Sequence, residues 1–217
     1  MNIISIKTET NGESRRIELS DGSVFSFMPC YLPPDFDESL CAPEICGERS
    51  INIDEEEALR FASACTRAEM AALKLIARAE QSPAGLSYKL EKRGHDRACV
   101  QRVIFRLQEL TLLDERRFVR LWLESRIARR ADSPRRLLAN LCARGIDRDY
   151  AESGVKAALD TATELDILRR YVKKLEKRKN YPKITGRNNA DAERSLKYHL
   201  KGEGFSSLVI EMLADEE

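Results

Sequence analysis

Arginine and lysine side chains in the second half of the chain are the residues whose type and spacing suggest a chemical role. Between residues 114 and 148 the sequence has ten arginines against five acids. A guanidinium is planar and forms paired hydrogen bonds to phosphate or carboxylate groups, so this cluster favours recognition of a polyanionic partner. The residues that we expect to contact the partner are Arg116, Arg117, Arg120, Arg126, Arg129, Arg130, Arg135, Arg136, Lys173, Lys174, Lys177 and Arg178.

The alternative for any charged run is a solvated helix face that binds nothing. Two features favour binding here: arginine predominates over lysine in residues 114–148, and residues 169–187 hold nine basic side chains against Glu176 alone. The acids that usually alternate with bases on a solvated helix are therefore few. Tyr181 is the aromatic residue that we expect to be exposed near these clusters, whereas Trp122 is expected in the core between repeats. Sequence-specific base reading is not expected.

Histidine and cysteine do not form a pattern that supports catalysis or metal binding. The two histidines, His95 and His199, stand far from any pair of cysteines, and the six cysteines lack CxxC spacing. Structural zinc requires closely spaced ligand pairs. The sequence also lacks a glycine-rich phosphate loop, HExxH and GxSxG. We therefore expect no catalytic site, cofactor or metal, and we expect Cys65, Cys99 and Cys142 to be core thiols.

The elements that position these residues are predicted to be mostly helices. The 217 residues are 42% hydrophobic and only 6% aromatic, and strong helix formers predominate. With no signal peptide and no run of about 18 apolar residues, we expect a cytoplasmic protein that does not enter the membrane. Residues 1–28 differ, because apolar and polar residues alternate there around turns at NGE and Asp21-Gly22. This pattern predicts a β-meander of about three strands, followed by a proline-containing linker.

Helices are predicted from residue 54 onward, where Asp54 and Glu57 have the spacing of a capping box. Two segments then repeat one another: residues 82–97, SPAGLSYKLEKRGHDR, and residues 133–148, SPRRLLANLCARGIDR. Serine and proline begin a helix, two leucines four residues apart form its apolar face, and glycine ends it before the next cap. A weaker third copy lies at 192–210. The three turn glycines are Gly94, Gly145 and Gly204.

A longer amphipathic helix precedes each pair, so each repeat is predicted to be a three-helix unit. We place the long helices at about 67–80, 114–131 and 164–179. The predicted apolar faces are Phe118, Leu121, Trp122 and Ser125 in the second, and Leu168, Tyr171, Val172 and Leu175 in the third. The predicted divisions are 1–50 for the meander and linker, then repeats at 51–112, 113–161 and 162–217. Such small units are marginal alone, so we expect tandem repeats in an elongated, curved array.

The segment LLDERRF at 112–118, followed by an arginine-rich helix and the LxxxLxxRGI turn of residues 137–146, resembles the RecX family. The resemblance spans roughly residues 54–217. The chain departs from the family at Thr111, where Gly is usual, at Ser133-Pro134, where a Gly and a basic residue are common, and at Gly202-Glu203, where Arg-Arg is usual. RecX proteins are bacterial regulators of the RecA recombinase.

The resemblance implies a regulator that binds RecA or its nucleoprotein filament and modulates, mostly inhibits, its ATPase, strand exchange and recombination or SOS activity. Whether single-stranded DNA is contacted directly is open at this point. The alternative is a helical nucleic-acid-binding module with no dependence on RecA, since short helices joined by a glycine turn also describe helix-turn-helix proteins. A helical scaffold for another protein is a third option. We expect a monomer.

Overall fold

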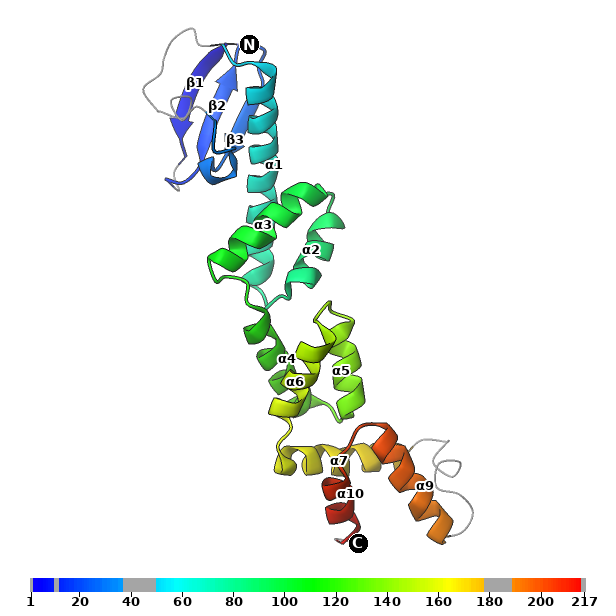
Figure 1. Cartoon of the computed structure of the whole chain (residues 1–217). Coiled ribbons are helices and arrows are strands. Elements are labelled where there is room, and N and C mark those ends of the chain that lie inside the picture. The colour runs from blue at the N-terminus through cyan, green and yellow to red at the C-terminus, as the bar shows by residue number, and fades with distance from the viewer. Residues whose placement is uncertain (1, 10–11, 37–49, 178–188, 216–217) are drawn as a thin grey trace. The chain divides into compact units, whose positions relative to one another are not determined.

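The computed structural model describes residues 2–9, 12–36, 50–177 and 189–215. The chain forms two compact units, Met1–Leu113 and Asp114–Glu217. Both contain helices, and the first also carries the N-terminal sheet, so the predicted mainly helical fold with a small β-meander is confirmed (Figure 1). Among the described residues, no helix combines the length and hydropathy needed to cross a membrane.

The first unit begins with an antiparallel sheet in the order β1-β2-β3. Strand β1 covers Ile3–Thr8, β2 covers Arg15–Leu19 and β3 covers Val24–Phe27. Gly22 in the second turn has φ of 86°, a left-handed conformation that glycine adopts without steric cost. Alternation along the strands buries one face of the sheet. The buried side chains are Ile3, Ile6, Ile17, Leu19, Phe25 and Phe27.

Helix α1, Ile53–Ile76, begins with a capping box formed by Asn52 and Glu55. The Asn52 Oδ1 accepts from the Glu55 N–H, and the Glu55 carboxylate accepts from the Asn52 N–H, both at 2.8 Å. The predicted box of Asp54 and Glu57 is wrong, because the helix starts two residues earlier and Asp54 lies within its first turn. The predicted first long helix at 67–80 is also wrong in its bounds, since α1 is one continuous helix of 24 residues.

The repeated segments fold into two helices joined by a glycine turn, as predicted. These are α2, Pro83–Glu91, and α3, Arg97–Glu109, in the first unit, and α5, Pro134–Cys142, and α6, Arg148–Ala158, in the second. Serine caps the first helix of each pair and aspartate caps the second. The turn glycines have positive φ: 84° at Gly94, 77° at Gly145 and 90° at Gly204.

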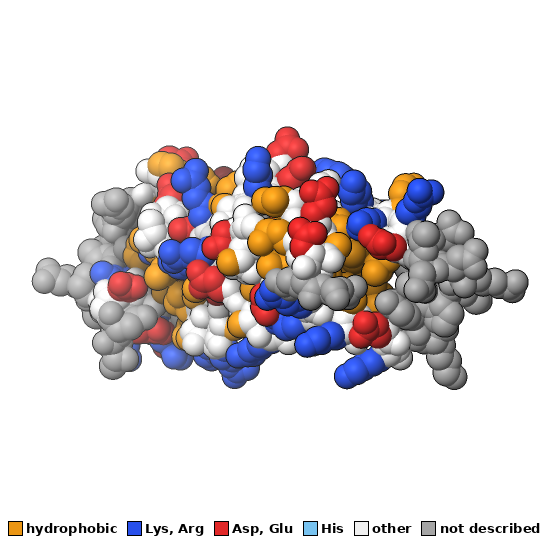
Figure 2. All heavy atoms as spheres, turned by 90° about the horizontal axis from the view of Figure 1, so that it is seen from below, with side chains coloured by type: hydrophobic (Ala, Val, Ile, Leu, Met, Phe, Trp, Pro, Cys, Tyr) orange, Lys and Arg blue, Asp and Glu red, His pale blue; other side chains and the backbone are white. Residues whose placement is uncertain are grey.

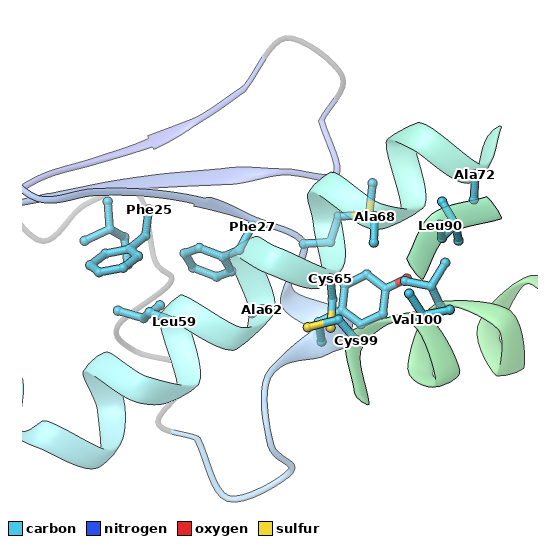
Figure 3. Close-up of a cluster of buried hydrophobic side chains, with 14 of the residues drawn as sticks. Phe25, Phe27, Leu59, Ala62, Cys65, Ala68, Ala72, Leu90, Cys99 and Val100 are labelled. Atoms are coloured by element: carbon cyan, nitrogen blue, oxygen red, sulfur yellow. The ribbon is translucent and has the colours of Figure 1, made fainter. Parts of the chain in front are cut away.

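The sheet and the first three helices share one hydrophobic core. Phe25 and Phe27 of β3 lie beside Leu59 and Ala62 of α1 (Figure 3). The same core continues along α1 to α2 and α3, and its further members include Cys65, Ala68, Ala72, Leu86, Leu90, Cys99, Val100, Val103 and Leu107. The meander therefore covers the N-terminal half of α1, which would otherwise expose apolar surface.

The predicted core positions of Cys65 and Cys99 are confirmed, since both thiols are buried. Burial raises the pKa of each thiol above its ordinary value of 9.0. Cys142 is only half-buried at the edge of the second repeat's core.

A buried polar contact joins the segment after the sheet to α1 and α3. Tyr31 ends the short 3-10 helix Pro29–Tyr31 (η1) and donates its hydroxyl to the Glu69 carboxylate. Arg106 of α3 approaches the same carboxylate at 3.4 Å and lies 6.0 Å from the centroid of the Tyr31 ring. Glu69 is 4% exposed, so its charge is balanced inside the unit, as a buried carboxylate requires.

The second unit contains two three-helix sets. In the first set, α4, Glu115–Arg129, packs with α5 and α6. In the second set, α7, Thr161–Glu176, packs with α9, Asn189–Gly202, and α10, Ser207–Ala214 (Figure 1). The predicted apolar face of α7 is confirmed, because its four members are buried: Leu168, Tyr171, Val172 and Leu175.

The predicted apolar face of α4 is partly wrong. Phe118 is buried as expected, but Leu121 is 40% exposed and Ser125 is exposed, whereas Val119 and Leu123 are buried. The side chain of Val119 points at Gly154 of α6, where an added Cβ would lie 2.8 Å from Val119 Cγ1. This close approach of α6 turns the buried face of α4 toward Val119 and Leu123.

Glu203, just after α9, connects the third repeat to the start of α5. Its carboxylate accepts a hydrogen bond from the Ser133 hydroxyl at 2.5 Å, and its backbone oxygen accepts from the Arg135 N–H at 3.0 Å. Inside the third repeat, the buried Glu164 carboxylate accepts from the Ser206 N–H and hydroxyl at 2.7 and 2.9 Å. Carboxylates thus stabilise the N-termini of both α5 and α10.

Candidate partner-binding surface

Helix α4 presents the first group of predicted binding residues. Its N-cap is Asp114, whose carboxylate accepts from the Arg116 N–H at 2.8 Å. The side chains of Arg116 and Arg120 are exposed and lie one turn apart on the same face of the helix. Arg117, between them in sequence, is half-buried. Two further exposed arginines follow at the end of the helix, Arg129 and Arg130.

Two of the predicted binding residues, Arg126 and Arg136, are paired with one buried carboxylate. Asp132 lies in the connection between α4 and α5 and is 2% exposed. Its Oδ2 is 2.7 Å from Arg126 Nε, and its Oδ1 is 3.4 Å from Arg136 Nε. The two guanidiniums therefore compensate a buried charge that would otherwise be costly.

Trp122 lies beneath two guanidiniums at the edge of the second repeat. The Arg126 and Arg144 guanidinium carbons lie 5.6 and 4.9 Å from its ring centroid, within the range of cation–π attraction. The ring is half-buried against the second repeat's core. The predicted core position of Trp122 is thus wrong, because part of the ring is covered by arginine side chains rather than by apolar ones.

Arg135 lies where α5 meets the third repeat. Its side chain is exposed, and Nη1 donates to the Gly202 carbonyl at 3.2 Å. It stands at one side of a groove of about 610 Å³ that also includes Leu138, Val155, Arg148 and Lys156. Arg148 and Lys156 were not among the predicted binding residues. The helical phase of α6 is the property that brings both cations to the groove.

The predicted binding residues of α7 lie near its C-terminal end. Lys173, Lys174 and Lys177 are exposed, and cations at this end of a helix also complement its dipole. Arg178 and Tyr181 lie outside the described residues, so their predicted roles stay predictions. Arg170, earlier on α7, pairs with Asp166 at 2.6 Å and donates to the Ile127 carbonyl at 3.1 Å.

Acidic side chains lie among the basic ones. Figure 2 shows lysine and arginine side chains next to aspartate and glutamate on the face that it presents. At the start of α4, burial and the nearby Asp147 raise the pKa of Glu115. Within the described ranges, His, Cys, Asp and Glu side chains form no group of three placed to hold a metal ion. The chemistry that the surface offers is hydrogen bonding and charge attraction to an anionic partner.

Comparison with known proteins places the chain in a family. Residues 114–154, which include α4 and α5 and most of α6, match the family model described as RecX, second three-helix domain. The regulatory protein RecX of Treponema pallidum (strain Nichols) is 36% identical over 121 residues, covering 56% of this chain and 74% of the relative. That of Mycobacterium leprae (strain Br4923) is 31% identical over 144 residues, covering 66% and 81%.

Solved structures share the fold. A crystal structure of a regulatory protein RecX matches 99% of this chain and 98% of its own, with a TM-score of 0.72 and 17% identity. RecX from Lactobacillus salivarius matches 71% of this chain and 97% of its own, with a TM-score of 0.57 and 18% identity. Together with the identity to curated relatives over most of their length, these matches show that the chain belongs to the RecX family of regulatory proteins.

Proposed function

We propose that this protein binds the RecA recombinase, or the filament that RecA forms on DNA, and modulates it, mostly by inhibiting its ATPase and strand-exchange activities. Binding would use exposed basic side chains of the second unit and would involve no covalent chemistry. We further propose that it acts as a monomer in the cytoplasm. The effect on RecA would come from occupying filament surface and changing filament dynamics.

The observation that carries the proposal is the set of exposed arginines on α4 and at its C-terminal end, within the segment that matches the RecX family model. Arg116 and Arg120 project from one face, and Arg129 and Arg130 follow at its end. Exposed charges contribute little to folding stability, so retaining several of one sign on a short helix favours a role in binding. A filament on DNA offers both phosphates and carboxylates to guanidinium groups.

The test is the ATPase rate of RecA on single-stranded DNA with increasing amounts of this protein. We expect the rate to fall as the protein approaches stoichiometry with RecA, and the double charge reversal Arg116→Glu/Arg120→Glu to weaken that inhibition severalfold. The melting temperature of the variant should stay close to that of wild type, because both side chains are exposed. An ATPase rate that wild-type protein leaves unchanged would contradict the proposal.

A matched control is available in the first unit. Lys74 and Arg78 are also exposed, basic and four residues apart, at the end of α1. The double reversal Lys74→Glu/Arg78→Glu changes the net charge by the same amount and should leave inhibition as in wild type. Equal loss of inhibition in both variants would mean that net charge, and not the α4 surface, governs the interaction.

A further inference from the structure

The exposed face of α9 carries an aromatic ring between cations. Tyr198 is 82% exposed, and Arg194 and Lys201 lie four residues before it and three after it. At 3.6 residues per turn these three side chains share one face of the helix, with a cation on each side of the ring. The opposite face of α9 is buried, since Leu200 is a core residue.

This face borders a shallow pocket of about 630 Å³ to which α5 also contributes. Its lining includes Arg135 from α5 and Arg194, Tyr198 and His199 from α9. Among the described residues of the lining, Glu203 is the one acid; it accepts a hydrogen bond from Ser133 and is thereby held against the N-terminus of α5. Arg135 and Arg194 outnumber this carboxylate, so the net charge of the described lining is positive.

We propose that this pocket and the exposed face of α9 bind single-stranded nucleic acid, with a base stacked on the ring of Tyr198 and the flanking phosphates held by Arg194, Lys201 and Arg135. An aromatic ring set in a cationic groove is the combination with which proteins hold single strands without reading their sequence. The described residues that line the pocket include no aliphatic side chain, so an apolar peptide anchor would find little to pack on among them. A flat base needs only the ring face.

The inference deepens the proposed function, because it rests on a partner that contains a DNA strand. It assigns the strand contact to the junction of α9 with the start of α5, apart from the α4 arginines. Tyr198 is a residue that the sequence analysis passed over, since only its helical phase and its exposed fraction separate it from a core tyrosine such as Tyr171, which is 8% exposed.

The test uses the full-length protein without RecA and a fluorescein-labelled oligothymidylate, with binding followed by fluorescence anisotropy. Tyr198→Ala should weaken binding roughly 5- to 150-fold, the range found when one stacked base loses its ring, and Tyr198→Phe should bind almost as tightly as wild type. Tyr88→Ala removes a tyrosine of α2 that is 65% exposed and should leave affinity unchanged. In a plot of log affinity against log salt concentration, Arg194→Gln should make the slope shallower by about 1, the change expected when one phosphate contact is lost.

A second probe separates stacking from charge attraction. An oligomer of abasic deoxyribose phosphates of the same length should bind wild type more weakly than oligothymidylate does, and Tyr198→Ala should bind both probes equally. Equal binding of the two probes by wild type, unchanged affinity of Tyr198→Ala, or equally tight binding of a poly-glutamate peptide would overturn the inference. Because RecA is absent, a failed ATPase test with intact strand binding refutes only the proposed function, and the reverse result refutes only the strand site.

Discussion

At the residue scale, Asp132 is the carboxylate that pairs with two arginines of the second repeat, Arg126 and Arg136. It is buried and faces Arg126 and Arg136 at 2.7 and 3.4 Å. Replacing Asp132 with Asn keeps the shape but removes the charge, so we expect a loss of about 1.5–3 kcal/mol of unfolding free energy, the range for hydrogen bonds to charged groups. Urea denaturation followed by circular dichroism measures it.

The control for this substitution is Asp166→Asn. Asp166 also pairs with an arginine, Arg170, at 2.6 Å, but its side chain is 61% exposed. A surface pair of this kind contributes at most about 1 kcal/mol. An equal loss of unfolding free energy in Asp132→Asn and Asp166→Asn would mean that burial of Asp132 has no energetic consequence. It would contradict the structural role assigned to Arg126 and Arg136.

Thr111 adopts a conformation that suits glycine. Its φ is 55°, the one positive value among the described residues that are not glycine, and a β-branched residue is strained there. Thr111→Gly should therefore raise the unfolding free energy by about 0.5–1 kcal/mol, after allowing for the added entropy of the unfolded chain. Ser125→Gly, on the exposed side of α4, should instead lower it by roughly 0.5 kcal/mol. Thermal melting of the two variants distinguishes these signs.

The buried thiols predict how stability changes in alkali. Below pH 9.0, the ordinary pKa of a thiol, Cys65 and Cys99 are protonated in both folded and unfolded chains, and above it the unfolded thiols ionise while burial keeps the folded ones protonated. The unfolded state then binds fewer protons, so the unfolding free energy falls as pH rises from about 9. Urea midpoints between about pH 8 and pH 10 should show this fall, and Cys65→Ala should reduce it. A flat profile would contradict the prediction.

Local signals explain which single residues the sequence predicts correctly. The caps Ser82 and Ser133 and the glycine turns depend on neighbours within a few residues, and all fold as predicted. The role of Asp132 depends instead on burial between two helices, which no local pattern encodes. The same applies to Trp122, since its exposure is set by the arginines that fold over it.

At the element scale, the orientation of α4 decides which leucines stabilise the second repeat. Leu123 is 1% exposed and Leu121 is 40% exposed, although the sequence pattern favoured Leu121. We expect Leu123→Ala to cost about 2–5 kcal/mol, as for a fully buried leucine, and Leu121→Ala to cost less than about 1 kcal/mol. Chemical denaturation of both variants tests this. A larger loss of unfolding free energy in Leu121→Ala than in Leu123→Ala would support the face predicted from the sequence instead.

The difference between α4 and α7 shows when the spacing of apolar residues is enough to predict the buried face of a helix. Helix α7 has one continuous apolar stripe, and all four predicted members are buried. Helix α4 has apolar residues around much of its circumference, so several faces are compatible with its pattern. The choice is made by Gly154, which lets α6 approach Val119. A glycine in a helix of another segment cannot be connected to α4 from the sequence alone.

At the scale of the whole molecule, Ser133 and Glu203 form one of the contacts that join the two repeats of the second unit. These are two of the positions at which the sequence departs from the usual RecX pattern, and the structure places them in contact. In a double-mutant cycle of Ser133→Ala and Glu203→Gln, we expect a coupling of about 1–2 kcal/mol in unfolding free energy. Additive effects would show that the two departures are independent.

The candidate site is less predictable than the fold at this scale. The sequence finds the basic segments because charge composition needs no structure. It does not show that α9 and α5 meet at Arg135, or that Tyr198 faces outward there, because those relations join residues more than 60 positions apart. Tertiary packing decides which residues meet on one surface, whereas the sequence alone shows which segments are rich in arginine and lysine.

The Ser133–Glu203 contact also affects how a gene that encodes such repeats can gain or lose one of them. Duplicating the second repeat alone would create a copy of α5 whose serine faces no glutamate, because the acceptor is encoded some 70 codons downstream in the following module. Deleting the last repeat would remove this acceptor and leave the Ser133 hydroxyl facing solvent. Viable rearrangements should therefore copy or remove these modules together, or change both positions at once.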